Sequence, residues 1–328
     1  MLIVLTCVSD KMSKVIHSQG RELIFNVYKY MQEEKERQEL TVPFNNLQAR
    51  VAAATGVAVY KLERSPQANK FRSPWAIKKV LKEHLNHTQY GKRLCKEAEI
   101  LRTLDHPHII GFRAFKKNCL AMEECNKSLG DMIEERSSEG QSCYPAENIM
   151  KVALDISCAL NYLHTQAFLL HGDVKSFNIL IKGNFEICKL CDFGVSLPIT
   201  ANNEVDYTKT GNIDEYPGTR LWAAPEILEY PLKITTKVDM YAYGLVLWEM
   251  LALQPPCVEA LSDESLSEDF NESIIFGKRP DLPDDNYDSS YKYVLEMFYC
   301  CTEEDLNLRP SALDLVISIP EMMKELGI

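Results

Sequence analysis

The sequence contains no hydrophobic run long enough to cross a bilayer, which argues against a membrane-spanning protein. The apolar start, 1–8, lacks a preceding basic stretch and is followed at once by Asp10 and Lys11, so we expect no secretory signal. An excess of basic residues is also missing, since 36 Lys and Arg face 47 Asp and Glu for a net charge of −11. That balance argues against a general binder of nucleic acid or of membrane surfaces, and we expect no membrane partner.

Paired metal-ligand cysteines are missing as well. The 11 cysteines are scattered, and Cys188 and Cys191 form the only C-x-x-C, with no second pair to complete a zinc site. Because both lie in an apolar run, we interpret them as strand residues. Free thiols in this number suit a reducing compartment, so we expect a cytoplasmic or nuclear location, or both.

Negative charge is concentrated in residues 259–288, which contain ten acidic residues against two basic ones. The simplest interpretation is a solvated acidic loop. A docking surface for a basic partner is the alternative.

The order of the expected elements indicates an α+β fold. The 328 residues have room for one two-lobed domain of roughly 250–270 residues and a short extra segment. Short strands are expected at 75–80 and 119–122, with a helix at 93–104 between them and a segment at 57–62 that fits strand or helix. Mainly helices follow, at 148–166, 237–253 and 291–301, with a small hairpin of 179–181 and 188–190. Strands first and helices later favour a small β-rich lobe and a larger helical lobe over a doubly wound sheet.

The most informative stretch reads His-Gly-Asp-Val-Lys-Ser-Phe-Asn and is followed by an Asp-Phe-Gly turn. It places Lys175 two residues and Asn178 five residues after Asp173, and Asp192 follows fourteen residues later. Phosphoryl transfer needs such a set. One carboxylate orients the attacking hydroxyl, while an amide oxygen and a second carboxylate hold magnesium on the phosphates.

With this pattern the chain resembles the eukaryotic protein kinases over about 57–325. The resemblance implies their two-lobed fold, ATP as phosphate donor, Mg²⁺ as metal and a protein as substrate. It makes Asp173 the catalytic base and Lys175 the residue that offsets charge on the transferred phosphoryl group. Asn178 and Asp192 would hold the magnesium.

The nucleotide site of this family has further matches. Lys78, in Trp-Ala-Ile-Lys, resembles the lysine that contacts the α- and β-phosphates. Glu97, nineteen residues on, stands where the family has the glutamate that pairs with that lysine and aims its ammonium group. The resemblance adds as nucleotide-contacting positions Val59, Ala76, Met122, Glu123 and Cys125.

Downstream, the resemblance implies structural contacts around the catalytic segment. Thr219 would bond both Asp173 and Lys175, which is a feature of the Ser/Thr kinases. Glu226 would form a buried ion pair with Arg309. The further expected contacts run from Asp239 to the catalytic-loop backbone and from His171 to the backbone near Asp192.

A narrower resemblance is to a PDZ-binding branch that is similar to the dual-specificity MAP kinase kinases. It is carried by Gly172, where an Arg is usual, and by segments such as Gly-Val-Ser-Leu-Pro, which begins with the Gly of the Asp-Phe-Gly turn. This branch implies a mitotic signalling kinase of the cytosol and nucleus. The chain ends in Glu-Leu-Gly-Ile without the Thr-x-Val pattern, so we expect no PDZ partner.

Gly172 has a mechanistic consequence within that resemblance. The usual Arg receives the activation-loop phosphate, so a phosphate on Thr208 or Thr210 lacks its normal cationic partner. Our hypothesis is that loop phosphorylation is not obligatory for assembling the site. The loop 192–226 is long and polar, and we expect it to be mobile.

The Gly-rich lid of a kinase, G-x-G-x-x-G-x-V, is not found upstream of Lys78. Gly56 and Val59 fit the end of the motif, but Ala52 and Ala54 stand at the earlier glycine positions, where a Cβ would obstruct the phosphates. We therefore expect the first strand and the lid to be missing. A pseudokinase scaffold with impaired nucleotide binding is thus the alternative to an active protein kinase.

Residues 1–56 form a separate helical segment in our interpretation. The stretch 50–57 is similar to the turn of a helix-turn-helix, and 14–30 resembles the N-terminal helical region of transposon-derived DNA-binding proteins in insects. An unrelated helical cap and a degenerate kinase strand are the alternatives. We expect a DNA partner only if this is a true helix-turn-helix, since nine basic and seven acidic residues in 1–66 leave a weak basic footprint.

The resulting domain prediction has three parts. Residues 1–56 are the helical segment, 57–125 are an incomplete N-lobe with its hinge, and 126–328 are the C-lobe with the acidic loop 259–288. A fusion at about residue 57 would explain the two different halves.

Overall fold

The computed structural model describes residues 57–61, 75–80, 88–116, 118–211, 213, 216–228, 234–256, 277–283 and 286–328. The chain divides into two compact units. We call the first, whose described residues belong to Met1–Arg102 and Phe112–Glu124, the strand unit. The second, with Thr103–Gly111, Cys125–Ala260 and Asn271–Ile328, is the helical unit. The predicted helix-turn-helix in 1–56 and the missing lid lie outside the described residues.

The strand unit contains an antiparallel sheet with the strand order β1-β2-β4-β3. The strands are β1 Val57–Lys61, β2 Trp75–Val80, β3 Phe112–Lys116 and β4 Cys119–Glu123. The segment that fitted strand or helix is therefore a strand, whereas β3 was not expected. β4 is a central strand and is apolar at Leu120, Ala121 and Met122, which are all buried.

One helix, α4 Thr88–Thr103, belongs mainly to the strand unit and begins five residues before the expected start at 93. Its buried side chains follow the spacing i, i+3, i+4, i+7, which is the pattern of a helix with one buried face. These residues are Leu94, Glu97, Ala98 and Leu101. The sequence thus places Glu97 on the buried face of α4 together with apolar neighbours.

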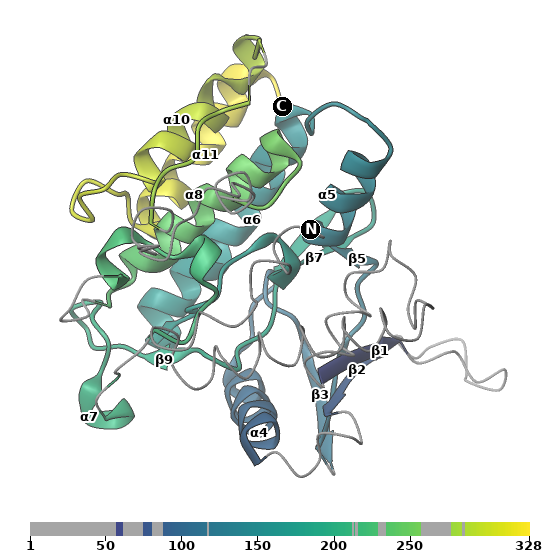
Figure 1. Ribbon diagram of the computed structural model, residues 1–328, viewed down its shortest axis with the longest axis vertical. Helices are drawn as coiled ribbons and strands as arrows, with labels where there is room; N and C mark the ends of the chain where they lie inside the picture. The colour runs from purple at the N-terminus through teal and green to yellow at the C-terminus, as the bar shows by residue number, and fades with distance from the viewer. Residues whose placement is uncertain are drawn as a thin grey trace, which may run out of the picture. The chain divides into compact units, whose positions relative to one another are not determined.

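The helical unit is built around α8 Lys237–Ala252, which is buried over nearly its whole length. A helix that is apolar all round is suited to such a position. Figure 1 shows the long helices of this unit running beside one another, and α6 contacts α8, α10 and α11. Their bounds are α5 Leu129–Ser138, α6 Ala146–Tyr162, α10 Lys292–Cys301 and α11 Ala312–Leu326. Within the described residues, no helix combines the length and the apolarity needed to cross a bilayer.

The helix expected at 148–166 is in fact two pieces. α6 ends at Tyr162 and continues as a short π-helix, Leu163–Ala167, which Phe168 ends with a left-handed backbone at φ 50°. The extra backbone residue of a π-turn leaves no trace in an apolar repeat, so the sequence indicated one uninterrupted helix. The helices α5 and α11 were not expected.

Short strands frame the segment after the π-helix. β6 Leu169–Leu170 pairs with β9 Leu197–Pro198. The expected hairpin is present as β7 Ile179–Lys182 and β8 Ile187–Leu190, and β5 Lys127–Ser128 extends it. Cys188 is a buried residue of β8, but Cys191 lies just beyond the strand, so the prediction that both are strand residues is wrong for Cys191.

A buried ion pair links the end of the activation segment to the loop before α11. The Arg309 guanidinium lies 2.7 and 2.8 Å from the two carboxylate oxygens of Glu226, and Arg309 is 1% exposed. Its remaining donors bond the backbone carbonyl oxygens of Glu303, Glu304 and Lys237. The predicted contact is therefore confirmed, with the cation fully hydrogen-bonded as a buried charge requires.

Replacing Glu226 with Gln removes the charge that neutralises Arg309 and keeps the side chain's size. We expect Glu226→Gln to lower the free energy of unfolding by about 3 kcal/mol, because the guanidinium stays buried without a counter-ion. Urea unfolding at neutral pH measures this. The matched control is Glu303→Gln, whose pair with Arg279 is 40% exposed on the Glu303 side and should contribute less than about 1 kcal/mol. Equal losses in the two variants would contradict the argument from burial.

Candidate active site

The strand unit holds a buried Lys–Glu pair. The Nζ atom of Lys78 lies 2.9 Å from Oε2 of Glu97, and the two side chains are 11% and 2% exposed. Lys78 comes from β2 and Glu97 from the buried face of α4, so the pair ties the helix to the sheet. The predicted contact is present, and an ammonium group held in this way is aimed rather than free to rotate.

The predicted nucleotide-contacting residues of this unit lie around Lys78 in the sheet. Val59 is directly opposite Lys78 in β1, and Ala76 is opposite Met122 in β4. Because alternate residues of a strand share a face, Ala76, Lys78 and Met122 share one face of the sheet. Glu123 ends β4, while Cys125 is a buried residue with which the chain returns to the helical unit.

In the helical unit, the catalytic segment is anchored by Asp239 at the start of α8. Its carboxylate accepts the backbone N–H groups of His171 and Gly172, each at 2.9 Å, and lies 2.9 Å from Nε2 of His164. Asp239 is 1% exposed, so these are low-dielectric, charge-assisted contacts. The predicted anchoring of the catalytic-loop backbone is confirmed.

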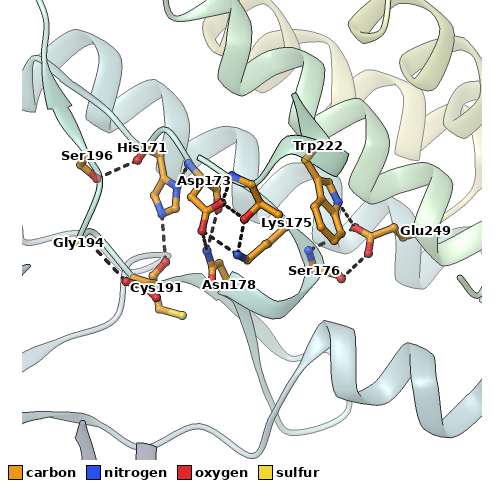
Figure 2. A network of polar contacts seen from close by, with 12 residues as sticks. His171, Asp173, Lys175, Ser176, Asn178, Cys191, Gly194, Ser196, Trp222 and Glu249 are labelled. Atoms are coloured by element: carbon orange, nitrogen blue, oxygen red, sulfur yellow. Dashed lines mark hydrogen bonds and ion pairs between the residues drawn. The ribbon is translucent and has the colours of Figure 1, made fainter. Parts of the chain in front are cut away.

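Asp173 is the centre of a polar network drawn in Figure 2. Its Oδ2 accepts a hydrogen bond from Lys175 Nζ at 2.8 Å and from Asn178 Nδ2 at 3.0 Å. Its Oδ1 accepts from the Thr219 hydroxyl at 2.6 Å and from the Thr219 N–H at 2.9 Å. The structure thus brings together four residues that the sequence singled out and that lie up to 46 positions apart.

The surroundings keep Asp173 ionised. Burial by itself would raise the pKa of this carboxyl group, but the Lys175 ammonium and the hydrogen bonds from Lys175 and Thr219 hold the pKa below its usual value. The Asp192 carboxylate opposes this effect. The result is a carboxylate that can only accept hydrogen bonds, as a residue that orients a hydroxyl proton must be.

Lys175 bridges Asp173 and the activation segment. Its Nζ atom lies 2.8 Å from the Asp173 carboxylate and 2.8 Å from Oγ1 of Thr219, so the predicted double contact of Thr219 is confirmed. A Thr side chain can serve both partners because its hydroxyl accepts from the ammonium while it donates to the carboxylate.

The hairpin of β7 and β8 brings the two predicted metal residues to one end. Asn178 immediately precedes β7, Asp192 follows shortly after β8, and the carbonyl of Asn178 accepts the N–H of Cys191 at 2.9 Å. The side-chain nitrogen of Asn178 is used by Asp173, at 2.7 and 3.0 Å, which leaves its Oδ1 for another partner. Asp192 has a left-handed backbone with φ 66°.

This donor set fits a hard divalent cation. The amide of Asn178 and the carboxylate of Asp192 both offer oxygen atoms as ligands. Mg²⁺ is commonly held by one or two such groups, and phosphate oxygens complete its shell. Among the described side chains, no group of three or more His, Cys, Asp or Glu is placed to hold a metal ion by itself, so phosphate oxygens would have to complete the shell. Asn178 and Asp192 are thus two described residues whose oxygens could hold such a metal.

Sequence reasoning missed Glu249. This α8 residue is 1% exposed and accepts hydrogen bonds from Ser176 Oγ at 2.5 Å, from the Ser176 N–H at 3.3 Å and from Trp222 Nε1 at 2.8 Å (Figure 2). It thereby joins the catalytic segment to the end of the activation segment. A signal was available, because a carboxylate inside the otherwise apolar run of α8 has to find buried partners.

The histidine of the catalytic segment supports the Asp-Phe-Gly turn. Nε2 of His171 lies 3.0 Å from the carbonyl oxygen of Cys191, and its ring packs edge-on against Phe193 at 5.0 Å. The hydroxyl of Ser196 donates to the His171 carbonyl at 3.0 Å. His171 thus has the structural contact that was predicted for it.

The burial of Glu249 predicts a pH-dependent stability. Burial raises the pKa of Glu249 to about 7, against the lowering effect of the bonds from Ser176 and Trp222. Because the folded state prefers the protonated form, this contribution to stability is fully present below about pH 4.5 and is lost as pH rises to about 7. The loss amounts to about 3 kcal/mol at pH 8.

The variant Glu249→Gln keeps the acceptor oxygen and cannot ionise. We expect its free energy of unfolding, relative to wild type, to rise by about 2 kcal/mol between pH 5 and pH 8. Urea unfolding of both proteins at the two pH values is the measurement. A difference between the proteins that stays constant with pH would contradict the prediction.

Comparison with known proteins places the chain in a family. The family model for the protein kinase domain matches residues 59–318. The human lymphokine-activated killer T-cell-originated protein kinase is 41% identical over 294 residues, which cover 84% of this chain and 90% of the human protein. The narrower resemblance seen in the sequence was to this kinase, and it is confirmed as a relationship of sequence.

Other relatives share a smaller part of the chain. A probable serine/threonine-protein kinase of Dictyostelium discoideum is 32% identical over 223 residues, 66% of this chain and 15% of that protein. A mitogen-activated protein kinase kinase kinase of Caenorhabditis elegans is 33% identical over 173 residues, 49% of this chain and 22% of that protein. With the mixed α and β elements described above, these matches confirm the predicted α+β fold of a protein kinase. The chain belongs to the protein kinase family and is a serine/threonine protein kinase.

Proposed function

We propose that this kinase is catalytically active and transfers the γ-phosphate of ATP to serine and threonine hydroxyls of a protein substrate, with Mg²⁺ as its metal. The observation that carries the proposal is the hydrogen-bonded set of Asp173, Lys175, Asn178 and Thr219. A chain that had lost catalysis would have no need to keep an ionised carboxylate surrounded by these donors, because burying it costs free energy.

Asp173 is the proposed catalytic base. Its Oδ atoms would accept the proton of the substrate hydroxyl and orient that hydroxyl toward the phosphorus atom. Lys175 is held beside Asp173 at 2.8 Å, where its positive charge would offset the charge on the transferred phosphoryl group. Positioning and electrostatics supply most of the rate in such a reaction.

Asn178 and Asp192 are the proposed metal residues. When bound, Mg²⁺ neutralises negative charge on the phosphate oxygens. Asn178 can offer its Oδ1 because its amide nitrogen is held by Asp173, which fixes the orientation of the amide group.

Lys78 is the proposed contact to the α- and β-phosphates, with Glu97 as the residue that aims it. The 2.9 Å pair supports this role, since a buried Lys held by a well-placed carboxylate has its ammonium group aimed in a defined direction. Glu123 and Cys125 would bond the adenine through their backbones. Ala76 and Met122 share the sheet face that carries Lys78, and Val59 pairs with Lys78 across the sheet.

A pseudokinase scaffold is the second candidate. It is favoured by Ala52 and Ala54, which stand where the lid glycines are expected. An active enzyme is favoured because all the expected reactive residues are present. These are Lys78, Glu97, Asp173, Asn178 and Asp192. Loss of a lid glycine weakens nucleotide binding more than it removes the chemistry.

Finer aspects of the function rest on the resemblance of the sequence. We propose a MAP-kinase-kinase-like signalling role in mitosis, in the cytoplasm and nucleus, with dual specificity as an extension to tyrosine. Residues 259–288 would offer an acidic surface to a basic protein partner. Binding of DNA would require the segment 1–56 to form a true helix-turn-helix.

The decisive test is ATP-dependent phosphorylation of a generic basic protein by wild type and by Asp173→Asn. We expect the variant to lose about a thousandfold in kcat, because an amide cannot accept the hydroxyl proton. Glu303→Gln, a change at an exposed pair, is the matched control and should keep wild-type activity. Equal background transfer by wild type and Asp173→Asn would support the scaffold instead.

The glycine at position 172 yields a second prediction. Since the activation-loop phosphate lacks its usual arginine, treatment with a phosphatase should change kcat/KM by less than about tenfold. Phosphate content before and after treatment is followed by intact-protein mass spectrometry. A larger loss that is restored by rephosphorylation of Thr208 or Thr210 would contradict this prediction.

A further inference from the structure

The activation segment touches the catalytic segment at two glycines. Gly172 has a left-handed backbone with φ 78°, and its N–H is held by Asp239. A Cβ built on Gly218 would lie only 2.2 Å from the Gly172 carbonyl oxygen. The two backbones are therefore in direct contact, at a distance that no other residue at 218 could reach without displacing one of them.

The ring of Tyr216 completes this contact. A Cβ on Gly218 would lie 2.4 and 3.1 Å from the Cε1 and Cζ atoms of Tyr216, and a Cβ on Gly172 would lie 3.9 Å from the Tyr216 hydroxyl oxygen. Tyr216 thus packs against Gly218 and reaches the space beside Gly172, where a side chain would otherwise stand. It comes from the same segment as Thr219, which follows it by three residues.

Acidic groups of this unit act on the hydroxyl of Tyr216. Burial raises the pKa of Tyr216 well above its usual value, and the carboxylates of Asp239, Asp173 and Glu226 raise it further. Tyr216 therefore stays neutral.

The threonines of the exposed turn α7 Tyr207–Thr210 make only local bonds among those described for them. α7 is a single turn whose Thr208 and Thr210 bond Asp206 and Gly211. Tyr207 is 42% exposed. The segment is tied to the catalytic loop through β9, which pairs with β6, and through the residues from Tyr216 to Thr219. Thr208 and Thr210 instead bond only nearby residues of the segment.

We propose that Tyr216 is a positioning residue that packs the Gly218–Thr219 turn onto the backbone of Gly172, so that Thr219 reaches Asp173 without an activation-loop phosphate. Only the expected effect of Tyr216 on phosphoryl transfer rests on the proposed function. The packing of the Gly218–Thr219 turn by Tyr216 can be tested without any kinase activity. Thr219 delivers two hydrogen bonds to Asp173, and both depend on the position of the Gly218 backbone beside Gly172.

The test compares Tyr216→Ala, Tyr216→Phe and Tyr207→Ala in phosphatase-treated full-length protein. Limited digestion with trypsin reads the segment directly, since Arg220 follows the packed turn and Lys209 lies in the exposed turn. Mass spectrometry gives the cleavage rate after Arg220 relative to the rate after Lys209. We expect this ratio to rise about tenfold or more in Tyr216→Ala and to stay within about twofold in Tyr216→Phe and Tyr207→Ala.

Kinetics on the same proteins give a second readout. Tyr216→Ala should lose about tenfold or more in kcat/KM for the protein substrate with little change in KM for ATP, and Tyr216→Phe should rescue it. An unchanged trypsin ratio in Tyr216→Ala would overturn the proposal. So would an equal loss of activity in Tyr216→Phe, because that would assign the effect to the hydroxyl rather than to the packed ring.

A second variant and a readout that needs no kinase activity complete the test. If Tyr216→Ala does not fold by circular dichroism, Gly218→Ala opens the same contact from the other side and is expected to show the same rise in the trypsin ratio. If wild type transfers no phosphate at all, the proposed function fails, and the trypsin ratio still decides whether Tyr216 holds the segment.

Discussion

The carboxylate of Asp239 is the constraint on which the catalytic segment depends. It is almost completely buried at the start of α8, and it is satisfied by the backbone N–H groups of His171 and Gly172 and by the ring of His164. Since a buried carboxylate without partners would be very costly, the segment has to remain where it can donate these bonds. The position of Asp173 follows directly, because it is the next residue along the chain.

From this anchor the other polar residues are positioned by short backbone paths. β7 begins directly after Asn178 and pairs with β8, and Asp192 follows shortly after β8. The hairpin thus returns the chain and brings Asp192 to the end where Asn178 lies. The activation segment then places Thr219 on Asp173 and Trp222 on Glu249. Buried polar and charged groups in this unit are thus hydrogen-bonded to one another, which offsets part of the cost of removing them from water.

Local patterns in the sequence predicted much of the fold and site. β2 and the hairpin were predicted within one residue at each end, because they are short apolar runs bounded by polar or turn residues. The pairs Lys78–Glu97 and Glu226–Arg309 were predicted from the family resemblance and are present. The π-helix, β3, α5 and the role of Glu249 were not predicted, because they depend on neighbours that are distant in the sequence or on a change of backbone hydrogen bonding that the apolar spacing does not record.

The sequence alone determined which chemical groups are present and in what order, and therefore that the chain resembles a protein kinase with Asp173, Asn178 and Asp192 as its reactive set. Only the tertiary structure decided which groups meet. Glu249 lies 73 residues from Ser176 in the chain, yet the two are hydrogen-bonded, and the raised pKa of Glu249 exists only because helix packing removes it from water. The contact of Tyr216 with Gly172 has the same origin, since backbone approach between distant segments depends on how the elements pack rather than on local propensity.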